Sequence, residues 1–294
     1  MAPHTPPDWG TGETEACRQL VRLALAEDLG DAGDVTSAAL LPEDLQGQAA
    51  FLARTVGVVA GWPAVRLVYE AVDPSLALEW RCADGQAVTP GTVLGTVRGR
   101  MRTLLTGERT ALNFLQRLSG IATQTRQFVD AVAGLACQIL DTRKTTPGWR
   151  RLEKYAVRCG GGTNHRIGLF DGVLIKDNHL AALRGTPHLI RHAVETARKA
   201  APGLPIEVEV TTLDQLDEAL ACGPDLVLLD NMDLPTLREA VRRRDRSAPG
   251  VRLEASGGVT LATVRAIAET GVDRISIGAL THSARALDIA LDYQ

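Results

Sequence analysis

Basic side chains are concentrated between Gln138 and His179, where they could bind a small polyanion. Eight basic and four acidic residues give this segment a surplus of four positive charges, whereas the whole chain has a formal net charge of −3. The basic residues are Arg143, Lys144, Arg150, Arg151, Lys154, Arg158, Arg166 and Lys176, and the acids are Asp141, Glu153, Asp171 and Asp177. A cationic segment in a slightly acidic protein favours a pocket for a small polyanion over a general adhesive surface.

The basic side chains of this segment differ in the anions that they suit. Arg143 and Arg166 carry planar guanidinium groups, which can bind a carboxylate or a phosphate through two parallel hydrogen bonds. Lys144 and Lys176 are compact charges that suit a diphosphate. His165 could donate a hydrogen bond to an anion, although an isolated histidine is more often structural, and its assignment rests on its neighbour Arg166.

Two carboxylates, Glu209 and Asp230, stand at the ends of neighbouring predicted strands. Oxygen ligands without a histidine or cysteine partner suit Mg²⁺, which usually keeps water molecules and bridges to substrate phosphates. The alternative is that these carboxylates only neutralise Lys144 and Lys176, and both interpretations can hold together. The pattern does not resemble a zinc site.

The segment Ser256-Gly257-Gly258 predicts a glycine turn that leads from a strand into a helix, and Gly278 follows later in the chain. Backbone N–H groups at a helix N-terminus, together with a serine hydroxyl, can bind a phosphate. The alternative is an ordinary tight turn. Its place late in a series of strand–helix units favours the phosphate, because late loops of α/β barrels often bind one.

Short apolar runs alternate with helical patterns after Gly134, which predicts a parallel sheet. The expected strands are Gln138–Leu140, Val173–Ile175, Ile206–Val210, Leu226–Leu229, Val251–Leu253 and Arg274–Ile277, and the expected helices include Thr186–Ala200, Leu213–Ala221, Leu234–Arg246 and Thr260–Thr270. Six or seven such units, without a dinucleotide-binding glycine motif after the first strand, favour closure into an α/β barrel. Catalytic groups of such barrels lie at the C-terminal ends of the strands, where the candidate residues fall.

The first part of the chain mixes helices with antiparallel strands. Helical spacing predicts helices at Glu13–Asp28 and Pro63–Val72, and a long one at Arg102–Val132 with a break at Ser119-Gly120. A strand is expected at Gln48–Ala60, and a loop follows Gly30; Leu76–Cys82 is a second expected strand, before a glycine-rich region of hairpins. On spacing alone, Arg109 is a solvated residue of the long helix.

The composition excludes several classes of protein. Five scattered cysteines without a C-x-x-C pair argue against a disulfide framework or a structural zinc site and favour a cytoplasmic protein. No apolar run approaches the roughly 18 residues that a membrane helix needs. Four arginines between Arg242 and Arg246 end a predicted helix, where cations favour the helix dipole. With only 4% aromatic residues, the chain is not expected to bind nucleic acid.

Several long motifs resemble the quinolinate phosphoribosyltransferase family. They are DTRKTTPGWRRLEKYAVRCGGGTNHRIGLFDGVLIKDNH, the EDLG-x-x-GDVTS loop, GERTALNFLQRLSGIAT, IEVEV, LVLLDNM, LEASGGV and ISIGALTHS, and they cover nearly the whole chain. The resemblance implies an N-terminal α/β open-sandwich domain over residues 1–117, onto which a tail at 283–294 could pack, and an incomplete six- or seven-stranded α/β barrel over 118–282. It also implies a homodimer that could assemble further.

The resemblance implies a Mg²⁺-dependent reaction that joins quinolinate to phosphoribosyl pyrophosphate and yields nicotinate mononucleotide, pyrophosphate and CO₂. By resemblance, the quinolinate carboxylates would be held by Arg143, His165, Arg166 and Lys176, and the pyrophosphate side would be faced by Lys144 and Lys176. Metal and ribose would be bound by Glu209 and Asp230. The 5′-phosphate would be held by Ser256, Gly257, Gly258 and Gly278, and a further substrate contact would come from Thr142. Arg109 matches a family arginine that reaches the partner subunit's site, which replaces its interpretation as a solvated residue.

Two other functions remain open at this point. A related phosphoribosyltransferase could act on another anionic acceptor, and a non-catalytic barrel could bind a phosphate ligand. Glu209 and Asp230 favour an enzyme, because a sensor has no need to activate a leaving group.

Overall fold

The computed structural model describes residues 7–293, which form two compact units. The first unit contains the described part of Met1–Arg126, together with Lys144–Gly162 and the described part of Ala279–Gln294. The second contains Gln127–Arg143 and Thr163–Gly278. The expected division after Arg117 would cut a continuous helix, α4 (Met101–Ala131).

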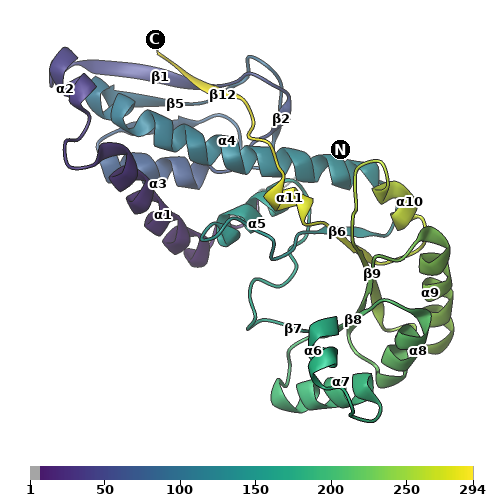
Figure 1. The fold of residues 1–294 in the computed structure, drawn as a ribbon. Helices are drawn as coiled ribbons and strands as arrows, with labels where there is room; N and C mark the ends of the chain where they lie inside the picture. Colours follow the sequence, from purple (N-terminus) through teal and green to yellow (C-terminus); the bar gives the residue numbers. More distant parts are fainter. Residues whose placement is uncertain (1–6, 294) are drawn as a thin grey trace. The chain divides into compact units, whose positions relative to one another are not determined.

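The first unit is built on a four-stranded antiparallel sheet with the order β12-β1-β5-β3. Its strands are β1 (Gln46–Ala53), β3 (Ala77–Trp80), β5 (Val93–Arg100) and β12 (Ile289–Tyr293), and a short pair is formed by β2 (Gly57–Val58) and β4 (Ala87–Val88). Its helices are α1 (Thr11–Leu29), α2 (Val35–Leu40), α3 (Trp62–Val72), α4, α5 (Arg150–Cys159) and α11 (Ala279–His282). Figure 1 shows β12, in yellow, running beside β1, although the two strands come from opposite ends of the chain.

Three details of the first unit differ from the sequence expectation. The expected loop after Gly30 contains α2, because the side chain of Asp34 accepts a hydrogen bond from the Ser37 N–H at 2.9 Å and so caps a short helix. The expected strand Gln48–Ala60 is divided into β1 and β2. The break expected in the long helix is absent, since α4 runs without interruption through Ser119 and Gly120.

Tertiary contacts explain the small polar and glycine residues within α4. The Ser119 hydroxyl donates to the Ala60 carbonyl at 3.2 Å and accepts from the Ala60 N–H at 3.0 Å. A Cβ atom on Gly120 would lie 2.0 Å from the carbonyl oxygen of Arg285. Ser119 and Gly120 therefore serve contacts with other segments and do not end the helix.

The second unit is a six-stranded parallel sheet with the order β6-β11-β10-β9-β8-β7. Its strands are β6 (Gln138–Leu140), β7 (Val173–Ile175), β8 (Ile206–Val210), β9 (Leu226–Asp230), β10 (Arg252–Ser256) and β11 (Arg274–Ser276), and its helices are α6 (Asp177–Ala182), α7 (Leu189–Ala200), α8 (Leu213–Cys222), α9 (Leu234–Ser247) and α10 (Val264–Ala268). Within residues 7–293, β6 and β7 do not pair with each other, so the barrel is incomplete. The predicted fold class is confirmed.

The strand register places the acids of β8 and β10 on one face of the sheet. Val208 of β8 is aligned with Val227 of β9, and Val227 is aligned with Leu253 of β10; all three are buried. Glu207 and Glu209 alternate with Val208, so their side chains project from the opposite face of the sheet. Since Glu254 is aligned with Leu228, as is Glu209, the acids of β8 and β10 share that face.

Among the helices of residues 7–293, none combines the length and the apolar character that a membrane span requires.

Candidate functional site

Lys176 and Glu209 meet at the C-terminal ends of two neighbouring strands. Lys176 directly follows β7, and Glu209 is the fourth residue of β8. The Lys176 ammonium group forms an ion pair and a hydrogen bond with the Glu209 carboxylate. The suggestion that this carboxylate neutralises a lysine is therefore correct for Lys176.

Asp230 lies beside this ion pair in the register of the sheet. It is the last residue of β9, two residues after Leu228, which is aligned with Glu209. The two carboxylates thus belong to the same face, on adjacent strands. Asp230 Oδ2 accepts a hydrogen bond from Asn231 Nδ2 at 2.7 Å.

The donor set of Glu209 and Asp230 fits Mg²⁺ that is shared with a phosphate ligand. Two carboxylates, one of them already paired with a lysine, supply too few oxygens for an all-protein cage. Mg²⁺ is commonly bound by one or two carboxylates, substrate phosphates and water. A cluster of three potential ligands does occur among the described residues, but it consists of His165, Glu207 and Glu254 and includes neither Glu209 nor Asp230.

The glycine turn after β10 packs closely against the end of β9. The Asn231 N–H donates to the Ser256 carbonyl at 2.9 Å, and a Cβ atom on Gly257 would lie 2.1 Å from Asn231 Oδ1. Gly257 and Gly258 both have positive φ angles, of 104° and 57°. Glycine is therefore favoured at both positions by the backbone conformation, and at Gly257 also by the contact with Asn231.

The helix after this turn begins later than the sequence indicates. It was expected to start at Thr260, but α10 starts at Val264. The helix N-terminus therefore does not directly follow Ser256-Gly257-Gly258, because turns separate the two. The exposed backbone of the glycine turn is therefore the group that can bind an anion here. Gly278, the other candidate of this group, is half-buried and lies two residues after β11.

Arg143 and Arg166 lie near each other in the second unit. Burial and the positive charge of Arg143 lower the pKa of Arg166 below its ordinary value. The Arg166 Nη1 atom donates to the Gly172 carbonyl at 2.9 Å. Thr142, which precedes Arg143, is half-buried. The structure therefore brings together two of the cationic groups that their type and spacing indicate as anion-binding.

A buried aspartate holds the segment that carries Arg166. Thr163 forms a parallel bridge with Leu140, which directs the chain alongside β6. Asp141 is fully buried and accepts hydrogen bonds from Asn164 Nδ2 at 2.6 Å and from the His165 N–H at 2.8 Å. By sequence, Asp141 is only one of the four acids of the cationic segment. Its place directly after an apolar strand was the available sign that it is buried.

Both ring nitrogens of His165 already have partners. Nδ1 accepts the Arg166 N–H at 2.8 Å, while Nε2 lies 3.0 Å from Glu207 Oε2 and 3.5 Å from Glu254 Oε1. Burial lowers the pKa of His165, but the hydrogen bond and the charges of Glu207 and Glu254 outweigh burial and raise the pKa above its ordinary value. The expectation that His165 donates to a bound anion does not fit this arrangement, because its N–H is directed at carboxylates.

A cavity of about 240 Å³ lies next to these residues, within the second unit. His165, Arg166 and Glu207 line it together with residues at the amino-terminal ends of several strands, namely Val173, Leu226, Arg252 and Arg274. It therefore reaches towards the end of the strands opposite to Asp230. Of the predicted site residues, it contains His165 and Arg166.

Lys144 and Arg109 belong to the first unit. Lys144 follows Arg143 in the chain and is exposed, and its carbonyl accepts a hydrogen bond from the Thr281 hydroxyl at 2.8 Å. Arg109 is exposed on α4. Convergence of all the predicted residues on one mouth stays a prediction.

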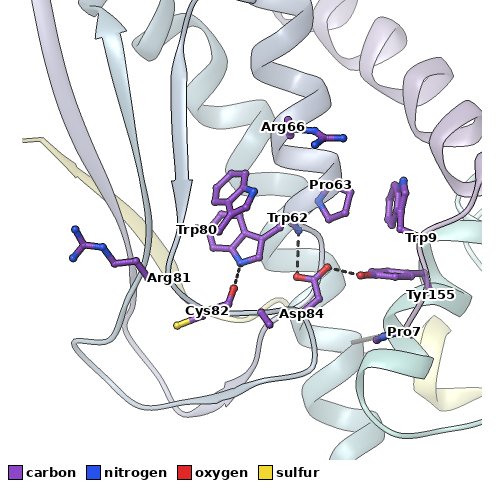
Figure 2. A pocket seen from close by; sticks show the side chains of 11 residues that line it. Pro7, Trp9, Trp62, Pro63, Arg66, Trp80, Arg81, Cys82, Asp84 and Tyr155 are labelled. Atoms are coloured by element: carbon purple, nitrogen blue, oxygen red, sulfur yellow. Dashed lines mark hydrogen bonds between the residues drawn. The ribbon is translucent and has the colours of Figure 1, made fainter. Parts of the chain in front are cut away.

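The first unit has a larger cavity, of about 550 Å³, that contains none of the predicted residues. Figure 2 shows its aromatic lining, in which the rings of Trp62 and Trp80 are stacked with their centroids 4.0 Å apart. Asp84 is buried there and accepts hydrogen bonds from the Tyr155 hydroxyl at 2.6 Å and from the Gly61 N–H at 2.9 Å. These bonds give Asp84 a structural role.

Comparison with known proteins gives consistent matches over nearly the whole chain. Residues 34–119 match the family model for the quinolinate phosphoribosyl transferase N-terminal domain, and residues 121–292 match that for the C-terminal domain. The nicotinate-nucleotide pyrophosphorylase [carboxylating] of Mycobacterium leprae is 48% identical over 283 residues, which are 95% of this chain and 98% of that protein.

The fold of this chain also matches those of solved structures over nearly its whole length. The nicotinate-nucleotide pyrophosphorylase from Francisella tularensis has a TM-score of 0.88 and 40% identity, over 96% of this chain and 97% of that one. NadC from Streptococcus pyogenes has a TM-score of 0.90 and 36% identity, over 98% and 99% of the two chains.

Replacing Asp141 with alanine should destabilise the second unit by about 2 to 4 kcal/mol, because two donors of the Asn164-His165 segment lose their acceptor. Urea unfolding would measure this change. The control is Asp130→Ala, at an exposed position of α4, which should change stability by less than about 0.5 kcal/mol. Equal stability of the two variants would contradict the anchoring role of Asp141.

Proposed function

Since the chain belongs to the quinolinate phosphoribosyltransferase family and is therefore a phosphoribosyltransferase, we propose that it acts on quinolinate with Mg²⁺ as its cofactor. The phosphoribosyl group would come from phosphoribosyl pyrophosphate, and the products would be nicotinate mononucleotide, pyrophosphate and CO₂. The observation that carries this proposal is the likeness, over 95% of the chain, to a relative named as carboxylating. The neighbouring guanidinium groups of Arg143 and Arg166 support it, because they suit a dianion.

Quinolinate carries two adjacent carboxylates, which Arg143, Arg166 and Lys176 would hold. In the free protein burial lowers the pKa of Arg166, and repulsion by the positive charge of Arg143 lowers it further. A bound dianion would replace this repulsion with charge-assisted hydrogen bonds. Lys176 would then exchange part of its contact with Glu209 for a contact with the substrate.

The phosphoribosyl pyrophosphate would be held by the remaining candidate residues. Lys144 and Lys176 would face its pyrophosphate, and Glu209 and Asp230 would hold Mg²⁺ and the ribose hydroxyls. The 5′-phosphate would lie against Ser256, Gly257, Gly258 and Gly278, with Thr142 as a further contact. The support for this part is the pairing of Lys176 with Glu209 and the open backbone of the glycine turn.

The first chemical step would be a substitution at the anomeric carbon. The lone pair of the pyridine nitrogen forms the new N–C bond while the C–O bond to pyrophosphate breaks and its electron pair leaves with the oxygen. The lysines would stabilise the growing negative charge, and the nearby carboxylates would favour positive charge on the ribose. Mg²⁺, when bound, would supply further positive charge to the leaving group.

Decarboxylation would follow from the charge that this step creates. Once the ring nitrogen is quaternary, the bond from the adjacent ring carbon to its carboxylate can break. The electron pair stays on that carbon, next to the positive nitrogen, and a proton from water completes the product. Neither step needs a general base, so a site rich in arginine and lysine can be catalytic through positioning and electrostatics.

We also propose that the protein forms a homodimer in which Arg109 reaches the partner's site, that such dimers can assemble further, and that the protein is cytoplasmic. The exposure of Arg109 on α4 supports the first part. The cytoplasmic location is supported by the five cysteines, all of which are free thiols.

The proposed reaction can be tested directly with purified protein, Mg²⁺, phosphoribosyl pyrophosphate and quinolinate. Release of CO₂ together with formation of a nucleotide is expected, and removal of Mg²⁺ by a chelator should stop both. Nicotinate in place of quinolinate should react poorly, because it offers the cations only one carboxylate. Efficient use of nicotinate would favour the related-transferase alternative, and binding of phosphoribosyl pyrophosphate without turnover would favour the non-catalytic alternative.

Replacing Arg166 with alanine should raise KM for quinolinate about 10- to 100-fold, the effect of losing one charge-assisted hydrogen bond. KM for phosphoribosyl pyrophosphate should change less than about threefold. Steady-state kinetics with each substrate varied in turn would measure both, with the exposed Arg184→Ala as the control. Equal losses for the two substrates would contradict the assignment of Arg166.

Replacing Lys144 with alanine should lower kcat about 100-fold, because the leaving pyrophosphate loses a cation in the transition state. The melting temperature should stay close to that of the parent protein, since this side chain is exposed. Single-turnover rates and thermal unfolding would measure these effects, with the exposed Lys199→Ala as the matched control. An unchanged rate would remove Lys144 from the site.

A further inference from the structure

Four polar side chains meet on the polar face of the parallel sheet, beneath the segment that carries Arg166. Glu254 is fully buried and Glu207 is 4% exposed. Arg274 of β11 is aligned with Glu254 of β10, and its Nε lies 3.5 Å from Glu254 Oε2. The ring of His165 completes the group through Nε2, which lies near both carboxylates.

The hydrogen bond from Arg166 determines which ring nitrogen of His165 carries the proton. Because Nδ1 accepts the Arg166 N–H, Nδ1 must present a lone pair. The proton of the neutral ring is then on Nε2, from which it is donated to Glu207. This assignment leaves the ring no N–H for a substrate.

The same hydrogen bond argues against a metal ion in the cluster. His165, Glu207 and Glu254 offer three ligand atoms within 4.8 Å of one another. A metal ion on Nε2 would displace its proton to Nδ1, where it would face the Arg166 N–H. The cluster is therefore suited to hold a ring in place and not to bind a cation.

The buried carboxylates of Glu207 and Glu254 fix the position of the His165 ring. Glu207 Oε1 has no hydrogen-bond partner within residues 7–293. The Nε2–H of His165 is thus the main hydrogen bond that Glu207 receives, and a buried carboxylate without a donor is costly. Burial and the charge of Glu207 raise the pKa of Glu254 to about 7, which limits the negative charge of the cluster.

We propose that Glu207, Glu254 and Arg274 hold the His165 ring, and that His165 acts as a positioning residue that fixes Arg166 and does not itself bind substrate. Arg166 is then fixed at two points, its backbone N–H on His165 and its guanidinium on the Gly172 carbonyl. This inference rests on the proposed function, because it assigns Arg166 to the quinolinate carboxylates. It differs from the direct substrate contact that the sequence resemblance implies for His165.

A double-mutant cycle separates positioning from direct binding. His165→Gln can place an amide near the Nε2 position and donate to Glu207, but it offers no acceptor at the Nδ1 position. We expect it to raise KM for quinolinate at least 10-fold, with KM for phosphoribosyl pyrophosphate nearly unchanged. In the Arg166→Ala background, where the backbone N–H remains but the guanidinium is gone, the same change should alter KM for quinolinate less than twofold. If the increases in KM for quinolinate caused by His165→Gln and by Arg166→Ala instead multiplied in the double variant, the proposal would be overturned.

His165→Asn is the matched variant for the other nitrogen. Its amide oxygen lies near the Nδ1 position and can still accept the Arg166 N–H, while its reach to Glu207 is lost. If His165 acts by positioning Arg166, the His165→Asn variant should have a lower KM for quinolinate than the His165→Gln variant. The reverse order would show that the Nε2 side serves the substrate and would overturn the proposal.

A measurement on the unmodified protein keeps the test independent of folding and of the reaction. Because the pKa of His165 is raised above its ordinary value, nitrogen-15 NMR of histidine-labelled protein would be recorded without substrates up to an alkaline pH at which the ring is neutral. Under those conditions His165 should show an unprotonated Nδ1 and a protonated Nε2. The resonance would be assigned by its loss in the His165→Gln variant, or from sequential connectivities if that variant does not fold. A neutral ring with the proton on Nδ1 would overturn the proposal, whereas failure of the unmodified protein to convert quinolinate would count against the proposed function alone.

Discussion

Charge balance on the polar face of the parallel sheet is the constraint that the second unit must satisfy. The sequence IEVEV of β8 places two glutamates on one side and apolar residues on the other. Because strand side chains alternate, a shift of one residue in register would exchange the two sets. Each buried carboxylate on this face therefore requires a cation or a donor, and a parallel sheet fixes where that partner must lie.

The partners come from segments outside the strands as well as from the strands themselves. Lys176 follows β7 and neutralises Glu209, while the loop residue His165 donates to Glu207. The anion-binding groups are thus part of the same electrostatic arrangement as the acids. Arg143 and Arg166 remain close to each other and carry an unfavourable repulsion, which a negatively charged ligand would relieve.

Local sequence patterns predicted what is determined locally. The strands of the second unit were placed within a few residues, because short apolar runs lie between polar loops and turn residues. Gly120 was misread as a break because its role depends on Arg285, which is distant in sequence. The orientation of His165 was missed for a similar reason, since Glu207 and Glu254 become its neighbours only when the sheet forms. The candidate residues could be chosen by type and spacing, whereas their hydrogen-bond partners could not.

The pairing of β12 with β1 affects how the first sheet forms while the chain is synthesised. Its five residues, Ile289–Tyr293, pair with β1, which leaves the ribosome far earlier. During translation, the backbone amides and carbonyls on one edge of β1 therefore lack their partner strand until Ile289–Tyr293 have been made. An open strand edge of this kind can recruit another nascent chain. The residues after α11 therefore complete the first sheet only late in synthesis, and in the finished sheet β12 takes the edge position in place of β1.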